Sequence, residues 1–259
     1  MHQVLLNIGP ITIWSYGFMM SLGMAGGILL AWLIARKRGK YNEDVFNMGF
    51  SVLLAGLAGS RLWEVVFDWD YYRSHLLDIP ALWQGGLSVQ GAVFGGLLGV
   101  FIYTRKKGIP FWEYCDILAP GVLLGQAIGR LGCYLNGCCF GIPASSAAWG
   151  VIYPPGTDAH TLYGETPLIP AVLYESAWDL FMMALLLFLI PRKPFHGFIA
   201  SLYFTMYAAG RIVIEYFRAD SLTAWGFKTA QITSAITILA ALALMIYLWM
   251  KSATAGVKK

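Results

Sequence analysis

Ionisable side chains inside long apolar runs are the residues of this sequence that are best placed to do chemistry. Arg130, Glu175 and Arg211 are three of them, and each interrupts a stretch long enough to cross a membrane. A charge near the centre of a bilayer costs at least about 2.5–3.5 kcal/mol, so it needs a partner, a water-filled cavity or a function. Arginine keeps its charge when partly buried, and its planar guanidinium fits phosphate oxygens. We therefore expect a site that binds a phosphate group, such as a phospholipid headgroup.

The full set of these charges comes from four apolar runs. It consists of Arg61, Glu64, Arg130, Glu175, Asp179, Arg211 and Glu215. Arg61 and Glu64 have the i,i+3 spacing of a helical ion pair. Arg211 and Glu215 have the i,i+4 spacing, so one interpretation of the set is structural. The other is functional, and it places Arg61 among the residues that bind the substrate.

The composition places these residues in a membrane. Hydrophobic residues make up 58% of the 259 positions and charged residues only 12%, which is too few charges for the surface of a soluble protein. Seven apolar runs have the length of membrane-spanning helices, and they lie at about 11–34, 46–67, 86–104, 115–136, 169–190, 197–217 and 229–250. We expect an all-α integral membrane protein with a single domain over 1–259. Its Pro-, Gly- and Ser-containing stretch at about 137–168 is expected to form an outer loop or cap.

The basic residues predict the orientation of the chain. They cluster after the first, third, fifth and last runs, at 36–40, 105–107, 192–193 and 251–259. Since cytoplasmic loops carry the excess of Lys and Arg, the N-terminus is expected outside and the C-terminus inside. This bias also accounts for the net charge of +4, so a nucleic-acid partner is not expected.

The orientation brings the polar groups to one depth. Arg130 and Arg211 fall in the last third of spans that run outward. Gln90 and Glu175 fall in the first third of spans that run inward, and Tyr16 lies near the outer start of the first span. We therefore expect these groups to converge in the outer half of the membrane. Independent ion pairs would have no reason to share a depth.

Helical stripes indicate which faces point inward. Polar residues recur every three or four positions along the sixth run, at Tyr207, Arg211, Glu215 and Arg218. That spacing puts them on one helix face, where they can line a cavity together. Glycines recur every four positions in the third and fourth runs, at 91, 95 and 99 and at 121, 125 and 129. Small residues at this spacing predict two surfaces where helices pack closely.

Several stretches together resemble one known family. In chain order they are IGPITIWSYG (8–17), GGLSVQGAVFGG (85–96), DILAP (116–120), GRLGCYLNGCCFG (129–141), LYES (173–176) and YAAGRIVIEYFRAD (207–220). With them the chain resembles the prolipoprotein diacylglyceryl transferases over nearly its whole length. The resemblance implies an enzyme of the bacterial inner membrane that needs no metal or redox cofactor. It would move the diacylglyceryl group of phosphatidylglycerol to the lipobox cysteine thiol of a prolipoprotein, so its partners would be that lipid, the prolipoprotein signal peptide and the surrounding membrane lipids.

The resemblance also implies roles for individual residues. Arg130 and Arg211 match family arginines that would hold the phosphate and offset the charge of the leaving group. Glu175 matches a carboxylate that would orient an arginine. Tyr16 and Tyr207 match hydrogen-bond donors near the headgroup.

The family signature includes matches and departures. Asn136 and Gly141 match its end, where the chain is expected to turn tightly. Cys133 and Cys138 stand where the family usually has Asn and Glu, and Gln90 stands where it usually has a histidine that has been proposed as the base. Glutamine cannot accept the thiol proton. Either the arginine-rich field ionises the substrate thiol, whose ordinary pKa is about 8.5, or this relative has an altered substrate or has lost its activity.

The cysteines leave several interpretations open. Cys133 continues the glycine face of the fourth run and can act as a small packing residue there. A disulfide between Cys133 and Cys138 would need the helix to end between them, in an oxidising compartment. Cys139 adds a third thiol, but three cysteines without a second cluster or a nearby histidine lack the usual four-ligand spacing of a metal site. Cys115 lies at the other end of the run.

A lipid or small-anion transporter is the alternative class of function, beside a phospholipid-binding relative with altered transferase activity. Converging arginines in a polar cavity would serve a transporter as well. The sequence shows no inverted repeat, and its charges collect in one leaflet, whereas alternating access favours a site near the midplane. Transferase activity is therefore the preferred interpretation.

Overall fold

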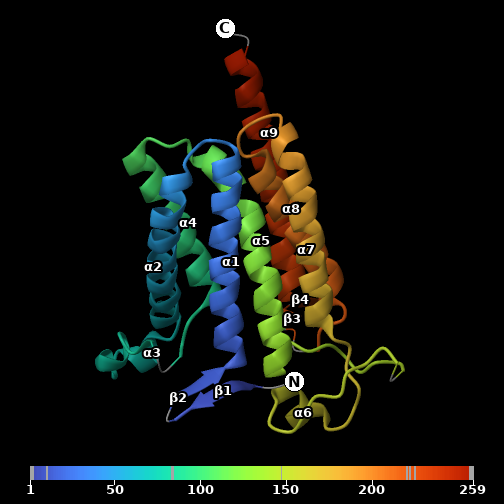
Figure 1. Cartoon of the computed structure of the whole chain (residues 1–259). Coiled ribbons are helices and arrows are strands. Elements are labelled where there is room, and N and C mark those ends of the chain that lie inside the picture. Colours follow the sequence, from blue (N-terminus) through green and yellow to red (C-terminus); the bar gives the residue numbers. More distant parts are fainter. Residues whose placement is uncertain are drawn as a thin grey trace. The chain divides into compact units, whose positions relative to one another are not determined.

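Each of the seven expected apolar runs overlaps a long helix. The computed structural model describes residues 3–9, 11–82, 85–146, 148–219, 221, 223–224 and 226–256. Its long helices are α1 (Ser15–Lys37), α2 (Asn42–Phe67), α4 (Val89–Lys107), α5 (Phe111–Asn136), α7 (Ala171–Leu189), α8 (Phe198–Glu215) and α9 (Thr229–Gly256) (Figure 1). The described residues also form the short helices α3 (Trp69–Tyr72) and α6 (Asp158–Tyr163) and 3-10 turns at Leu76–Asp78 and Ile190–Arg192.

Six of these helices are long and apolar enough to cross a membrane, counted over the residues that the structure describes. They are α1, α2, α5, α7, α8 and α9. The remaining long helix, α4, ends in three consecutive basic residues, Arg105–Lys107, which lower its apolar content. The chain is therefore a multi-pass membrane protein, whereas the count of seven spans and the orientation stay predictions.

The first expected span begins later than the apolar run suggests. Residues 11–14 form strand β2 (Ile11–Trp14), which pairs antiparallel with β1 (Val4–Ile8), and α1 starts only at Ser15. The β-branched Ile11, Thr12 and Ile13 favour an extended backbone. A second short hairpin, β3 (Thr223–Ala224) with β4 (Phe227–Lys228), precedes α9. The expectation of an all-α membrane protein is confirmed, and these two short hairpins stand beside its helices.

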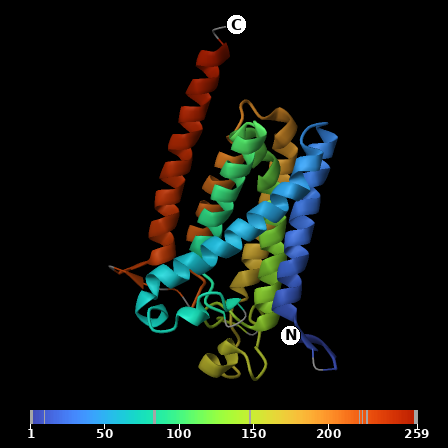
Figure 2. The same ribbon diagram turned by 90° about the vertical axis from the view of Figure 1, so that its left-hand side faces the viewer.

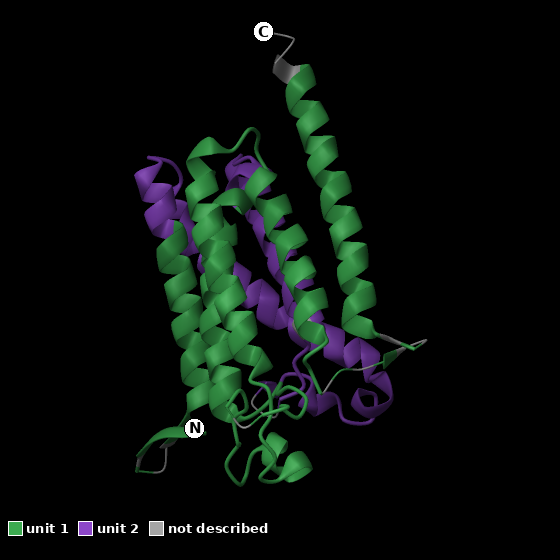
Figure 3. Cartoon of the chain, turned by 90° about the vertical axis from the view of Figure 1, so that its right-hand side faces the viewer, with its two compact units in different colours: residues 1–31, 115–259 green, residues 32–114 purple. Residues whose placement is uncertain are grey.

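The chain divides into two compact units, which Figure 3 shows in different colours. Unit 1 contains residues 1–31 and 115–259, and unit 2 contains residues 32–114. The expectation of a single domain stays a prediction.

Glycines join α1 to α5 in unit 1, where Figure 2 shows the two helices side by side. A Cβ added to Gly27 would lie 2.5 Å from the carbonyl oxygen of Gly121. One added to Gly23 would lie 2.8 Å from the oxygen of Gly125. The backbones touch at these positions, so the prediction that Gly121 and Gly125 lie on a packing surface is confirmed.

The second glycine stripe packs α4 against α2 in unit 2. A Cβ added to Gly59 of α2 would lie 2.5 Å from the oxygen of Gly91 and 2.8 Å from the Cα of Gly95. A Cβ added to Gly99 would lie 2.9 Å from the Cβ of Ala55. This predicted packing surface is confirmed as well, and it leaves no room for larger side chains.

Buried side chains fix α5, α7 and α8 against one another. Ser176 of α7 donates a hydrogen bond of 2.9 Å to the carbonyl of Ala127 in α5. Trp178 of α7 donates one of 3.2 Å to the carbonyl of Met206 in α8. A Cβ at Gly210 would overlap the Trp178 indole, so this glycine makes room for the ring. The three helices therefore hold one another in register.

Asp116, which the sequence reasoning did not assign, caps α8. Its carboxylate is fully buried and accepts hydrogen bonds from the backbone N–H groups of Gly197 and Ala200, at 2.9 and 3.0 Å. The Lys193 ammonium lies 2.7 Å away. These bonds satisfy N–H groups that a helix start leaves without intrahelical partners. The sequence offered one signal for this role, an acidic residue at the edge of an apolar run.

The segment at 137–168 forms a small cap with its own core. Phe140, Tyr153, Ala159 and Leu168 are buried together, and α6 contributes one of them. Isolated bridges join Leu168 to Pro143 and Val151. The cap lies at the same end of unit 1 as the β1–β2 hairpin (Figure 1). Gln3 connects the two by donating to the carbonyls of Asn136 and Gly156, each at 3.1 Å.

Candidate active site

One buried carboxylate gathers three arginines in unit 1. Glu175 of α7 is only 5% exposed. Its Oε2 lies 2.5 Å from Nε of Arg130, which comes from α5. Its Oε1 accepts from Arg211 of α8 and lies 3.2 Å from Nη1 of Arg218. Charges from three separate parts of the chain therefore meet at one side chain, where the sequence had placed Arg130, Glu175 and Arg211 at one depth.

A second carboxylate, Glu215, completes the cluster. Its Oε2 lies 3.0 Å from Nη2 of Arg211 and 4.0 Å from Nε of Arg218. The i,i+4 pair expected from the sequence is thus present, but it is one link in a network rather than an independent pair. We name Arg130, Glu175, Arg211, Glu215 and Arg218 the arginine–glutamate cluster.

Arg218 joins the cluster from outside the helix. The sequence placed it on the face of one helix with Arg211 and Glu215, whereas α8 ends at Glu215. Arg218 instead pairs with Gly141 in an isolated antiparallel bridge, so the end of the signature segment positions it. The Lys228 ammonium also donates to the carbonyls of Glu215 and Arg218, which holds this segment.

The cluster carries one more positive than negative charge. The side chains of Arg130 and Arg211 are 23% and 20% exposed, and that of Arg218 is 8% exposed. The two glutamates are almost fully buried. Asp179, which is buried and lines the neighbouring cavity, is a further carboxyl beside these arginines. Two of the guanidiniums remain partly exposed, and a guanidinium suits an anion such as phosphate.

A cavity lies beside Glu175 and Arg211. Its other lining residues are Trp178, Asp179, Tyr207 and Ile214. The space that the centre of a water molecule can occupy is about 10 Å³, which is room for about one water. Tyr207 is therefore next to the cluster, as the sequence predicted. A phosphate group would enter only if side chains at the cavity moved.

Tyr16 lies near the same end of α5. Its ring is placed against Gly132, where an added Cβ would lie 3.5 Å from Tyr16 Cδ2. Its phenol is close enough to interact electrostatically with Arg130 and Cys133. This tyrosine is 41% exposed. The structure thus places Tyr16 near Arg130, as expected.

The tight turn after α5 lies between Asn136 and Gly141, as the sequence indicated. Asn136 ends the helix, and the positive φ angles occur at Gly137 (75°) and Cys139 (58°). Gly141 follows the turn and lies against the carbonyl oxygens of Ile169 and Phe217. A Cβ there would come within 2.7 Å of the Phe217 oxygen, so glycine is needed for the close approach of two chain segments.

Arg61 holds a loop in unit 2. Its guanidinium donates to five backbone carbonyls in the segment 78–86, among them Ile79 at 2.8 Å and Gly85 at 2.7 Å. The guanidinium also lies 5.0 Å from the centre of the Tyr72 ring. These contacts use all its donor groups and give Arg61 a structural task in place of the expected pair with Glu64. Its expected contact with the substrate stays a prediction.

Gln90 also belongs to unit 2, in the first turn of α4. Its Oε1 accepts a 2.8 Å hydrogen bond from Ser88, and Ser88 in turn caps the helix by accepting from the N–H of Gly91. Gln90 is exposed. Its expected place near Arg130 and Arg211 stays a prediction, because Gln90 lies in unit 2 and the two arginines lie in unit 1.

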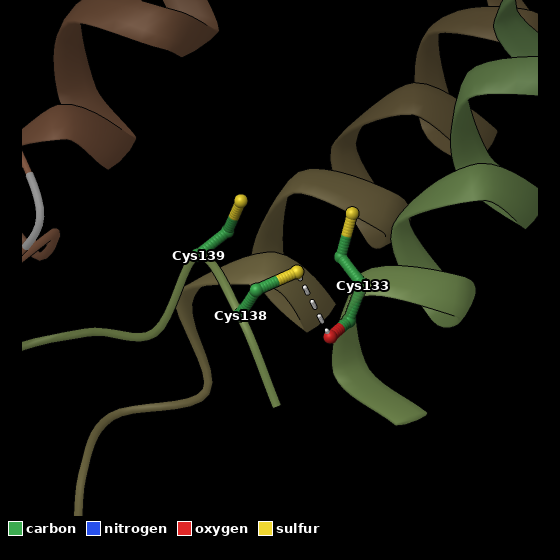
Figure 4. Close-up of side chains that lie close together, drawn as sticks. All are labelled: Cys133, Cys138 and Cys139. Carbon is green, nitrogen blue, oxygen red and sulfur yellow. Dashed lines mark hydrogen bonds between the residues drawn. The ribbon is translucent and has the colours of Figure 1, made fainter. Parts of the chain in front are cut away.

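Three of the four cysteines meet at the end of α5 (Figure 4). The Sγ atoms of Cys133, Cys138 and Cys139 all lie within 4.8 Å of one another, and all four cysteines are free thiols. The disulfide considered from the sequence is thus not formed. Hydrogen bonds from the other two thiols, together with the Arg218 guanidinium, hold the pKa of Cys139 below its ordinary value. Cys115 lies outside this group.

Comparison with known proteins identifies the family of this chain. The family model for prolipoprotein diacylglyceryl transferase matches residues 3–247. A phosphatidylglycerol–prolipoprotein diacylglyceryl transferase of Nostoc sp. is 35% identical over 96% of this chain and 89% of its own length. Those of Geobacillus kaustophilus and Symbiobacterium thermophilum are 35% and 36% identical, over 95% and 98% of this chain and 92% and 95% of their own lengths. With this similarity along nearly its whole length, the chain belongs to the prolipoprotein diacylglyceryl transferase family.

Proposed function

We propose that this protein transfers the diacylglyceryl group of phosphatidylglycerol to the lipobox cysteine of prolipoproteins. The arginine–glutamate cluster is the observation that carries the proposal. It provides partly exposed guanidiniums that a buried carboxylate holds in place beside a cavity, in a membrane protein of this family. Relatives that are similar over nearly the whole chain are named for this reaction.

The reaction is a displacement at carbon. The sulfur of the lipobox cysteine forms a bond to the glyceryl carbon, the bond from that carbon to the phosphate oxygen breaks, and glycerol phosphate leaves with the electron pair. Negative charge therefore grows on the phosphate as the reaction proceeds. Preorganised donors directed at such a charge contribute most when water is excluded.

Each residue of the cluster has a task in this scheme. Arg130 and Arg211 bind the phosphate through their exposed N–H groups, while Glu175 fixes the direction of both guanidiniums. Tyr207, which lines the cavity, and Tyr16, which lies against α5, donate hydrogen bonds to the headgroup. Because the cavity holds only about one water, the headgroup enters from its exposed side as side chains move.

The membrane placement follows from the basic loops. With the Lys and Arg clusters in the cytoplasm, the cluster and the cap face the outer leaflet of the bacterial inner membrane. A secreted prolipoprotein presents its lipobox on that side. Reporter fusions after the C-terminal ends of α4 and α9 would show on which side of the membrane each end lies. Either end found outside the cytoplasm would contradict this placement.

The direct test is transfer in vesicles that contain phosphatidylglycerol, the purified protein and a peptide with a lipobox cysteine. We expect the peptide to gain the mass of a diacylglyceryl group through a thioether, and glycerol phosphate to be released. The variants Arg130→Lys and Arg211→Lys should each lower the rate by roughly 100-fold, because lysine keeps the charge but loses the planar fork.

Arg192→Lys is the matched control. Arg192 is exposed, and among the residues that the structure describes it interacts only with Phe188. It should transfer at the normal rate. Movement of lipid or anion across the vesicle without modified peptide would instead favour the transporter. Full activity of both cluster variants would remove the phosphate-binding role of these arginines.

A further inference from the structure

The group of three cysteines, Cys133, Cys138 and Cys139, has no part in the reaction scheme above. Cys133 lies in the last turn of α5, and the other two follow the turn at Gly137 (Figure 4). The backbone N–H of Cys138 donates to the carbonyl of Cys133 at 3.2 Å, which folds the turn back onto the helix. Cys139 itself has a left-handed backbone, which is uncommon for a residue other than glycine.

The segment beyond Cys139 is held as firmly. The carbonyl of Phe140 accepts from the N–H of Ala219 at 3.3 Å, and Gly141 pairs with Arg218. Phe140 is buried in the core of the cap. Both sides of the turn are therefore anchored, and the three sulfur atoms are brought together by fixed backbone rather than by a flexible loop.

The distances suit a metal ion that prefers sulfur. In tetrahedral zinc sites the Zn–S bond is about 2.3 Å, so the sulfur atoms lie about 3.8 Å apart. The present separations of up to 4.8 Å require only small side-chain movements to reach that value. Thiolates without carboxylates or imidazoles select soft ions over magnesium or calcium.

The group supplies three ligands, and zinc takes four. Within the described residues, the set of nearby potential ligands ends at these three cysteines. Three protein ligands with an open fourth position are the arrangement of catalytic zinc, whereas structural zinc is enclosed by four. The spacing in the sequence offers three protein ligands, and a substrate can supply the fourth.

The neighbouring charges favour such a complex. Zn²⁺ with three thiolates carries a net charge of −1, and Arg218 is within hydrogen-bonding reach of Cys139. Arg130 interacts electrostatically with Cys133 and Cys139. The guanidiniums would stabilise the anionic complex, and the complex would lie directly beside the arginine–glutamate cluster.

We propose that Cys133, Cys138 and Cys139 bind Zn²⁺, and that the open position takes the substrate's cysteine thiol. This proposal rests on the transfer reaction proposed above. Coordination replaces a zinc-bound water with the substrate sulfur, and the thiol proton passes to solvent. The bound thiolate then attacks the glyceryl carbon, glycerol phosphate leaves with the electron pair, and the neutral thioether, a weak ligand, dissociates.

The proposal supplies what Gln90 cannot. A thiol that coordinates zinc is deprotonated outright, so no histidine is needed to remove its proton. The two departures from the family signature, a glutamine at position 90 and cysteines at 133 and 138, then have one chemical explanation.

Metal content is the first test, and it does not depend on activity. The full-length protein, purified in detergent with a reductant and Zn²⁺, should retain about one zinc per chain by mass spectrometry. Replacement by Co²⁺ should give the intense near-ultraviolet band of cobalt thiolates. Cys138→Ser and Cys139→Ser should each weaken zinc binding by more than the roughly 10–100-fold that loss of an outer-shell partner costs.

Cys115→Ser is the matched control, because Cys115 lies on the same helix but outside the group, and it should bind zinc normally. A wild-type protein that retains no zinc would overturn the proposal without any variant. So would serine variants that bind zinc as tightly as the wild type, or a disulfide found among the three cysteines in the protein isolated from cells.

The open position is tested with peptides. A peptide with the lipobox cysteine should shift the cobalt band, whereas the same peptide with serine should not. Equal responses to both would overturn the substrate's place on the metal. Removal of zinc should lower transfer by roughly 100-fold, and normal transfer without zinc would also overturn the proposal. Zinc binding that responds to the cysteine peptide in a protein without transferase activity would instead overturn the proposed function and leave the metal site supported.

Discussion

Glu175→Gln is the most informative single change, because one carboxylate holds three guanidiniums. Glutamine keeps the shape of the side chain and removes its charge. The pairs of Glu175 with Arg130 at 2.5 Å, with Arg211 and with Arg218 at 3.2 Å are all lost. Arg211 and Arg218 then share the single carboxylate of Glu215, and Arg130 loses its carboxylate partner.

The magnitude follows from burial. Removing one partner of a buried ion pair costs about 3–5 kcal/mol. Two of the three arginines are about one-fifth exposed, so water takes over part of their stabilisation and the lower end applies. We expect a loss of about 3 kcal/mol in the free energy of unfolding, which is about 10²-fold in the folding equilibrium at 1.4 kcal/mol per factor of ten.

Two measurements check this expectation. Reversible unfolding in mixed micelles gives the stability, and transfer in vesicles at a temperature where the variant is still folded gives the rate. We expect the rate to fall by at least about tenfold, because the phosphate-binding guanidiniums lose their fixed directions. Asp70→Asn is the matched control. It removes a carboxylate from the exposed pair with Arg73 at 3.3 Å, where about 0–1 kcal/mol is expected. Wild-type stability and rate in Glu175→Gln would refute the reasoning about the cluster.

Four other substitutions test separate parts of the structure. Gly121→Val should push α1 from α5 and lower the stability by about 1–3 kcal/mol in micelle unfolding, whereas Gly17→Ala, which meets no atom within 4 Å, should not. Gly210→Ala should cost a similar amount because its Cβ would overlap Trp178, and unchanged stability would show that the indole moves freely. Arg61→Lys leaves carbonyls of the segment 78–86 without donors and should cost about 2 kcal/mol in the same assay, while leaving the zinc content unchanged. Gln90→His should alter the transfer rate at neutral pH by less than about twofold if zinc ionises the thiol. A large rise, with a rate that no longer climbs with pH toward the thiol pKa of about 8.5, would assign the proton to position 90 instead.

The sequence was most informative where one helix decides the outcome. The spacing of Arg211 and Glu215 predicts their ion pair, and the recurrence of glycine at every fourth residue predicts surfaces where backbones touch. Both follow from the 3.6-residue turn alone. The partners across the interface, Gly23 and Gly27, were not predictable from spacing, because which helices become neighbours depends on the whole packing.

Side chains that bind backbone carbonyls were assigned least well. Arg61 looks like any other intramembrane arginine in the sequence, but its donors meet carbonyls of a segment about 20 residues farther on. Carbonyls are present in every residue, so nothing in the sequence marks these as acceptors. The sequence correctly placed Arg218 with Arg211 and Glu215, but for the wrong reason. A bridge to Gly141, rather than a longer helix, brings Arg218 to Glu175.

The division into two units has a consequence for biogenesis. Unit 1 is discontinuous, so α1 is synthesised first and its glycines meet their partners in α5 only after residues 32–114 have been made. Unit 2 is continuous, and α2 and α4 can close against each other as soon as both have left the ribosome. During that interval the glycine face of α1 is exposed to lipid or to an insertion factor. The order of synthesis therefore leaves α1 in the membrane without α5 until residues 32–114, which contain α2 and α4, have been made.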